Sequence, residues 1–150
     1  MAQSLSNILV HLVFSTKERR CLIDPAIEEE LHPYLATVCA TCGCPTHRIG
    51  GTEDHVHILS SLSRTISVSD LVREVKAESS KWIKTKGTQY EPFAWQSGYG
   101  AFSIGQSQMD RVLRYIAGQK EHHKKRDFQA EFRAFLEKYQ IEYDERYVWD

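Results

Sequence analysis

The order of strand-like and helix-like segments constrains the fold of this chain more than any other feature. A β-rich apolar run over residues 7–15 precedes a segment, about 26–41, whose apolar residues recur at helical spacing. Two more strand-like runs follow, over residues 46–49 and 55–62, with a glycine-containing hairpin loop between them. A second helical pattern covers residues 67–86. With a later strand, the order β-α-β-β-α-β predicts a ferredoxin-like fold.

Boundary signals and the later segments complete this prediction. Asp24-Pro25 suits the start of the first helix, Gly43 suits its end, and Ser69 is the expected N-cap of the second helix. We expect a short hairpin around Gly98 and then two more helices; the ranges are 93–97 and 100–104 for the strands, and Ser107 to about Lys120 and Asp127 to Tyr139 for the helices. Residues 1–150 should form one α+β domain, a ferredoxin-like or RRM-like antiparallel sheet with helices on one face plus a C-terminal tyrosine-bearing helix.

Composition excludes several classes of protein. No run of about 18 apolar residues occurs, so no membrane span is predicted. The polar N-terminus and the short apolar run after it indicate a strand rather than a signal peptide. We therefore expect a cytoplasmic protein whose 4 cysteines are reduced. The formal net charge of −1 gives, by itself, no electrostatic indication of nucleic-acid binding.

A cluster of cysteines raises the possibility of a zinc site. Cys39, Cys42 and Cys44 are close in sequence, His47 follows, and thiolates and imidazoles are the usual tetrahedral ligands of zinc. The chain has no second pair of closely spaced cysteines, and Cys39 occupies an apolar position of the first helix, where cysteine acts as a small hydrophobic residue. The structural interpretation is favoured, and zinc binding remains open.

Two histidines in the third strand-like run are the most informative residues. Side chains two apart lie on one face of a strand, so His55 and His57 should project together while Val56 and Ile58 point into the core. A lone histidine is more often a structural residue, but two adjacent imidazoles form a bidentate site for a metal ion. A catalytic metal site generally needs a third protein ligand and an open position, so another segment must supply that ligand.

The third predicted helix offers a candidate ligand. Arg111, Tyr115, Gln119 and His122 fall at spacings of four, four and three and form one polar stripe. Beside it runs an apolar stripe that would pack on the sheet, made of Met109, Val112, Leu113, Ile116 and Ala117. Most tyrosines in helices are structural. However, Tyr115 lies one turn before Gln119, whose amide oxygen could complete the metal site.

Taken together, these residues resemble a known family. His55-Val56-His57 is similar to the HUH motif of histidine, hydrophobic residue and histidine, and the segment from Tyr115 to Gln119 resembles the Tyr-x-x-x-Gln helix of a group of transposases. These are the single-tyrosine HUH transposases of small bacterial insertion sequences, the IS200/IS605 group. The resemblance covers essentially the whole chain, and further similar segments are Leu12–Lys17, Gly51 with Asp54, Trp95-Gln96 with Gly98-Tyr99, Ser103, and His122-His123.

This resemblance implies an activity, a cofactor and partners. Tyr115 would attack a phosphodiester of single-stranded DNA, giving a 5′-phosphotyrosine and a 3′-hydroxyl that can later rejoin DNA. A divalent metal ion, Mg²⁺ or Mn²⁺, on His55, His57 and Gln119 would polarise the scissile phosphate. The expected substrate has subterminal DNA hairpins. The expected assembly is a homodimer, often with the tyrosine helix completing the partner's site, because two DNA ends must be cut.

Local charge offsets the neutral total. Residues 73–86 contain five basic and two acidic side chains, and residues 120–126 contain four basic and one acidic. Such patches can follow phosphates, although either could be a solvated helix face. The expected DNA contacts come from these segments and from the tyrosine helix: Arg73, Lys76, Lys81, Lys84, Arg111, Lys120, His122, Lys124 and Lys125.

Three other functions compete with a transposase. The first is a domesticated HUH nuclease and ligase that processes single strands without moving an element; hairpins flanking the gene would distinguish the two. The second is a non-catalytic nucleic-acid-binding module, which the intact His55, His57, Tyr115 and Gln119 disfavour. The third, a zinc hydrolase, is disfavoured because only two histidines cluster in one motif.

Overall fold

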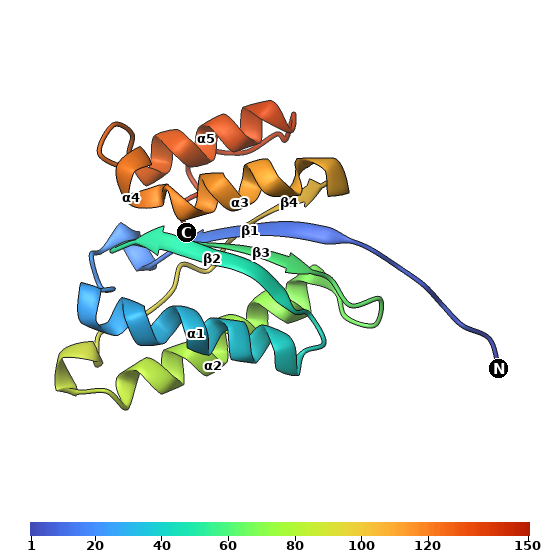
Figure 1. Cartoon of the computed structure of the whole chain (residues 1–150). Helices are drawn as coiled ribbons and strands as arrows, with labels where there is room; N and C mark the ends of the chain where they lie inside the picture. The colour runs from blue at the N-terminus through green and yellow to red at the C-terminus, as the bar shows by residue number, and fades with distance from the viewer.

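The structure, a computed structural model, describes residues 1–150. A four-stranded antiparallel sheet of order β2-β3-β1-β4 lies between two layers of helices (Figure 1). The strands are β1 (Leu9–Ser15), β2 (Thr46–Thr52), β3 (His55–Ser61) and β4 (Gly100–Ile104). Helices α1 (Pro25–Thr41) and α2 (Val68–Lys84) cover one face, and α3 (Met109–Ala117), α4 (Gln119–His122) and α5 (Phe128–Lys138) cover the other. The predicted α+β fold is confirmed, and the tyrosine-bearing helix lies on the face opposite α1 and α2.

β1, one of the two central strands, is buried on both faces, which explains its mostly apolar sequence. Val10, Leu12 and Phe14 join the larger core, which α1 and α2 cover. On the other face, Val13 packs in a smaller cluster beneath α5. Because β1 pairs with β3 and sets Val13 opposite His57, the same strand supports the core and the floor of the candidate site.

Both helices of the α1–α2 layer begin at a capping side chain. The Asp24 carboxylate accepts a hydrogen bond from the Ile27 amide at 2.8 Å, as the Asp-Pro sequence predicts. The predicted cap of α2 is wrong, because Ser67 rather than Ser69 accepts the capping bond, from the Asp70 amide at 3.0 Å. Ser67 has the extended backbone angles that a cap requires, whereas Ser69 already lies inside the helix.

The segment before β4 differs from the predicted hairpin. Residues 93–97 do not form a strand, and Trp95 makes only a single bridge, with Thr16. Tertiary packing overrides the strand propensity here, because the Trp95 side chain is buried in the larger core and its indole N–H donates to Ser79 Oγ at 2.9 Å. β4 pairs with β1 instead of with this segment.

The loop predicted over residues 50–54 is shorter in the structure. β2 continues through both glycines to Thr52, so only a two-residue turn connects it to β3. Gly50 lies directly beneath α3, where a Cβ atom would come within 2.4 Å of the Ile116 carbonyl oxygen. The absent side chain therefore permits the close approach of α3 to the sheet.

The predicted third helix is divided. A 3₁₀ turn, Gln106–Gln108, precedes α3, and Gly118 separates α3 from α4. Two other 3₁₀ turns occur, at Lys17–Arg19 and Thr88–Tyr90. No helix has the length and apolar character needed to cross a membrane.

The cysteine cluster does not gather into a metal site. Cys39 and Cys44 are buried in the larger core, and the Cys44 sulfur accepts a hydrogen bond from the Ser63 amide. His47 lies on β2, where its Nε2 is 2.8 Å from Ser61 Oγ. This placement supports the structural interpretation of the cysteines, and the residues whose donor atoms converge closely enough to hold a metal ion lie elsewhere.

Candidate active site

The two histidines of β3 lie side by side beneath the α3–α5 layer. His55 and His57 are both completely buried, and their rings are 5.2 Å apart between centroids. Their Nε2 atoms face one carboxylate oxygen, Glu131 Oε1, at 3.6 Å and 2.9 Å respectively. The alternation of side chains in β3 thus presents both Nε2 atoms to α5, while Val56 and Ile58 enter the larger core.

The opposite ring nitrogen of each histidine is held by a neighbouring side chain. His55 Nδ1 lies 2.7 Å from Asp54 Oδ1 and 3.0 Å from Thr52 Oγ1, whereas His57 Nδ1 lies 2.8 Å from His11 Nε2. Such contacts fix the ring orientation of metal-binding histidines. Burial lowers the pKa of His57 despite the nearby Glu131 charge, which favours the neutral imidazole that can bind a metal ion.

Glu131 of α5 is the centre of the site, and the sequence reasoning missed it. Its side chain is 1% exposed, and the two carboxylate oxygens face different groups. Oε1 faces the histidine pair, while Oε2 accepts hydrogen bonds from the Tyr115 hydroxyl and from Gln119 Nε2, the latter at 3.1 Å. Burial opposes a charge on Glu131, but the His123 and His57 imidazoles hold the pKa of this carboxyl well below its usual range.

The sequence carries a signal that could have revealed Glu131. The apolar face of α5 consists of Phe128, Phe132 and Leu136, and Glu131 lies within this face rather than on the polar one. A carboxylate at a buried helix position requires a partner. His11 has a similar signal, because it interrupts the apolar sequence of the buried strand β1.

Tyr115 and Gln119 converge on Glu131 from two successive helices. Tyr115 is half-buried at the inner side of α3, and burial together with the Glu131 charge raises the pKa of its hydroxyl well above the usual value. The break at Gly118 begins a new helix in which Gln119 is buried, with its Oε1 2.9 Å from His55 Nε2. The amide oxygen therefore adjoins the histidine pair, as the sequence spacing predicts.

The donor set fits a divalent metal ion. Ligand atoms of four residues, His55, His57, His123 and Glu131, lie within 4.8 Å of one another. His123 Nε2 is buried and lacks a hydrogen-bond partner of suitable geometry, although it lies 3.2 Å from Glu131 Oε2. An unpaired buried nitrogen beside a carboxylate and two imidazoles is the arrangement that a metal ion would complete. Gln119 adjoins this group.

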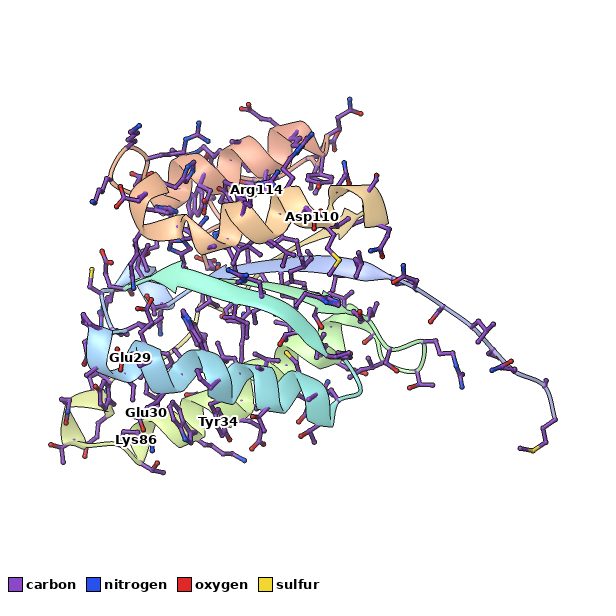
Figure 2. All side chains as sticks on the ribbon, in the orientation of Figure 1. Glu29, Glu30, Tyr34, Lys86, Asp110 and Arg114 are labelled. Atoms are coloured by element: carbon purple, nitrogen blue, oxygen red, sulfur yellow. The ribbon has the colours of Figure 1, made fainter.

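The predicted DNA contacts are divided between the two sides of the sheet. Arg73, Lys76, Lys81 and Lys84 lie on α2, in the layer opposite the site (Figure 1). Figure 2 shows the neighbouring Lys86 on that far side as well. Arg111, Lys120, His122, Lys124 and Lys125 belong to α3, α4 and the segment after them, on the side of Tyr115.

Several of these cations already have partners within the chain. Lys76 is half-buried and its ammonium donates to the Gln96 and Gly98 carbonyl oxygens at 2.8 and 2.6 Å; burial lowers the pKa of Lys76 to about 8. This lysine therefore fastens the segment before β4. The other paired side chains are Arg73 with Asp70, Lys81 with Glu78, Lys120 with Glu28 and Lys124 with Glu121, and His122 Nε2 lies 3.6 Å from Glu131 Oε2.

A comparison with protein families finds a match over most of the chain. A protein-family model described as "Transposase IS200 like" matches residues 4–119, which include His55, His57, Tyr115 and Gln119 but end before Glu131. No curated protein matches the chain.

Two solved structures share the fold. One is a protein assigned as a transposase from Deinococcus radiodurans R1, with a TM-score of 0.62 and 18% identity over 79% of this chain and 98% of that one. The other is a REP-associated tyrosine transposase bound to a REP hairpin, with a TM-score of 0.60 and 14% identity over 82% and 74% of the two chains. At these identities the likeness establishes the architecture.

Proposed function

This chain belongs to the IS200-like transposase family, and we propose that it cleaves and rejoins single-stranded DNA through a covalent bond between Tyr115 and a 5′-phosphate. One observation supports this most strongly. The Tyr115 hydroxyl, the Glu131 carboxylate and the His55–His57 pair, which come from three separate elements, converge in one buried group. A structural tyrosine would not require, at its hydroxyl, a buried carboxylate that two histidines contact from the other side.

The same buried group would also supply the ligands of a divalent metal ion. His55, His57 and Glu131, with Gln119 and His123 beside them, would hold Mg²⁺ or Mn²⁺. When bound, such an ion supplies positive charge that stabilises the negative charge developing on the scissile phosphate. The contacts from Asp54 and His11 keep the two Nε2 atoms directed inward for this purpose.

The nucleophile needs a proton acceptor, because a neutral phenol reacts poorly. In the proposed cleavage, Tyr115 Oη forms a bond to phosphorus, the bond from phosphorus to the 3′-oxygen breaks, and Glu131 Oε2 takes the tyrosine proton. The departing 3′-oxygen takes a proton from water. In rejoining, a 3′-hydroxyl attacks the same phosphorus and releases its proton to solvent, the bond to Tyr115 breaks, and the phenol recovers its proton from Glu131. The contact between Tyr115 and Glu131 requires no intervening group for this transfer.

The substrate and assembly that we propose are hairpin-bearing single-stranded DNA and a homodimer. The structural relative bound to a REP hairpin supports DNA hairpins at the ends of the substrate, and the need to cut two ends supports a homodimer.

We treat residues 1–150 as one domain, because β1 contributes to the cores of both layers. A domesticated nuclease that joins single strands would use the same residues, and hairpins flanking the gene would separate that alternative from a transposase.

The test is formation of a covalent protein–DNA adduct. The purified chain is incubated with Mn²⁺ or Mg²⁺ and labelled single-stranded oligonucleotides that tile the DNA flanking the gene, and adducts are resolved on a denaturing gel. We expect an adduct that requires the metal ion and disappears in Tyr115→Phe, while Tyr115→Phe still binds the DNA. Tyr99→Phe, at an exposed tyrosine, is the matched control and should form the adduct. An adduct that persists in Tyr115→Phe, or no adduct with any flanking oligonucleotide, would overturn the proposal.

A further inference from the structure

A groove runs between α3 and α5 on either side of the Tyr115 side chain. It consists of two adjoining hollows, each of about 140 Å³, that share Tyr115, Phe135 and Lys138. One hollow also reaches Glu131 and Arg126, and the other reaches Arg111. We call this feature the α3–α5 groove. It is where the tyrosine–carboxylate pair borders a hollow that reaches the surface.

Three cations surround the α3–α5 groove without carboxylate partners. Arg111, Arg126 and Lys138 are exposed, and none of them forms an ion pair within the chain. By contrast, Arg133 on the same helix α5 forms an ion pair with Glu145. Cations that remain free at the rim of a groove are available to an anionic ligand.

The walls of the groove add aromatic surface to this charge. Phe135 of α5 and Tyr139, the residue that follows α5, are half-buried, and each stacks on Phe102 of β4, with ring centroids 5.1 and 5.0 Å apart. Cations next to a fixed aromatic platform are the combination with which proteins bind single-stranded nucleic acid, because phosphates pair with the cations and bases stack on the rings. Two small adjoining hollows can accommodate successive nucleotides of a single strand but are too small for a duplex.

We propose that the α3–α5 groove binds the single DNA strand that carries the scissile phosphodiester. Arg126 and Lys138 contact phosphate oxygens next to Tyr115, and Phe135 contacts a neighbouring base. The inference rests on the proposed function of Tyr115 and assigns the path of the substrate to α5, a helix beyond the residues that the family model matches. It also assigns no DNA contact to α2, on the other side of the sheet.

A binding experiment without catalysis tests the phosphate contacts. Fluorescein-labelled oligothymidine of about 20 nucleotides is titrated with protein in EDTA at several salt concentrations, and fluorescence anisotropy is measured. For Arg126→Gln and for Lys138→Gln we expect the salt dependence of log K to decrease by about 0.7, and affinity near 0.05 M salt to fall about eightfold. Lys84→Gln is the matched control, because Lys84 is an exposed lysine without an ion pair on α2. It should bind like the wild type.

A crosslinking experiment tests the base contact. Oligothymidine containing 5-iododeoxyuridine is irradiated in complex with the protein, and crosslinked peptides are identified by mass spectrometry. We expect crosslinks to Phe135 on α5 or to Tyr139 at its C-terminal end. Crosslinks confined to α1 and α2 would overturn the inference, as would wild-type affinity and salt dependence in both groove variants. A change of oligomeric state in Lys138→Gln without loss of DNA affinity would also overturn it, since the groove would then be an interface between two copies.

These outcomes are separable from those of the adduct assay. If the wild type forms a Tyr115-dependent adduct while both groove variants bind DNA normally, the groove assignment is wrong and the proposed function stands. If the groove variants lose DNA affinity but no adduct ever forms, the groove binds DNA and the assignment of Tyr115 as nucleophile is wrong.

Discussion

One oxygen of Glu131 faces the histidine pair of β3, and the other faces the proposed nucleophile. Oε1 faces His57 at 2.9 Å, whereas Oε2 faces the Tyr115 hydroxyl and Gln119. One carboxylate therefore sets the distance between the proposed metal ion and the proposed nucleophile. A negative charge buried this deeply would destabilise the fold unless neighbouring groups paired with it.

Replacing Glu131 by glutamine should impair both sides of the site. Glu131→Gln keeps the shape of the side chain but removes the negative charge. We therefore expect Mn²⁺ affinity to fall by about 10- to 100-fold, the loss typical of disrupted metal sites. Adduct formation should fall with it, while DNA binding in EDTA remains. Isothermal titration with Mn²⁺ measures the affinity directly.

Glu137→Gln is the control for this substitution, because Glu137 is exposed on the same helix and forms no ion pair. It should bind Mn²⁺ like the wild type. If Glu131→Gln also does so, Glu131 is not a metal ligand, and only its contact with Tyr115 would remain in the mechanism.

Individual residues of the site differ in how far the sequence could predict them. His55 and His57 are two positions apart in one strand, so local periodicity alone puts them together. Glu131 lies 74 residues from His57, and the pair forms only because α5 folds back over β3. The position of Glu131 within an apolar helix face can be recognised in the sequence, but its pairing with His57 cannot.

At the scale of elements, the ends of helices depend on local sequence more closely than the pairing of strands does. The start of α1 was predictable from Asp24-Pro25, whereas the tyrosine helix, which was predicted to run to about Lys120, ends at Gly118. Residues 93–97 failed as a predicted strand because Trp95 is committed to the core and Lys76 binds the adjacent carbonyls. Strand pairing depends on which partners the fold supplies, and a single sequence does not contain that information.

The corrected cap of α2 gives a test of stability at this scale. Ser67→Ala removes the side chain that accepts a hydrogen bond from the Asp70 amide, so it should cost about 1 kcal/mol. The midpoint temperature of thermal unfolding should then fall by about 2–4 °C. Ser69→Ala is the matched control and should be neutral or slightly stabilising, because alanine favours a helix interior. Equal losses in the two variants would contradict the assignment of Ser67 as the cap.

Gly50→Ala tests whether the contact between α3 and β2 positions the nucleophile. The added Cβ would lie 2.4 Å from the Ile116 carbonyl oxygen, so α3 must move away from the sheet. We expect a loss of about 1–3 kcal/mol of stability, as for other overpacked sites, and a lower adduct yield. In the control Gly105→Ala the nearest atom is Gln108 Oε1 at 3.5 Å, an ordinary contact. Wild-type adduct yield in Gly50→Ala would show that α3 needs no close contact with β2.

At the scale of the whole molecule, the candidate site and the α3–α5 groove lie on one side of the sheet, and α1 and α2 lie on the other. On the α1–α2 side, Lys86 pairs with Glu30 (Figure 2). Lys76 of α2 donates hydrogen bonds to backbone carbonyl oxygens. On the α3–α5 side, a buried carboxylate is surrounded by histidines and by cations without carboxylate partners. The net charge of −1 averages over both layers, which is why it gave no indication of DNA binding.

The arrangement of the site within one chain predicts which chain supplies the tyrosine to each site of a homodimer. Tyr115 lies over its own histidines, with its ring 5.8 Å from that of His57, so a homodimer should contain two sites that are each complete within one chain. Mixing Tyr115→Phe with His57→Ala, after unfolding and refolding together, should therefore give no adduct. If the helices exchange between partners, about a quarter of the wild-type number of sites would be restored by random pairing, and an adduct would appear on the His57→Ala chain. A tag that changes the size of one chain would identify the labelled one, and co-refolded wild-type chains carrying the same tag would show that refolding itself preserves activity.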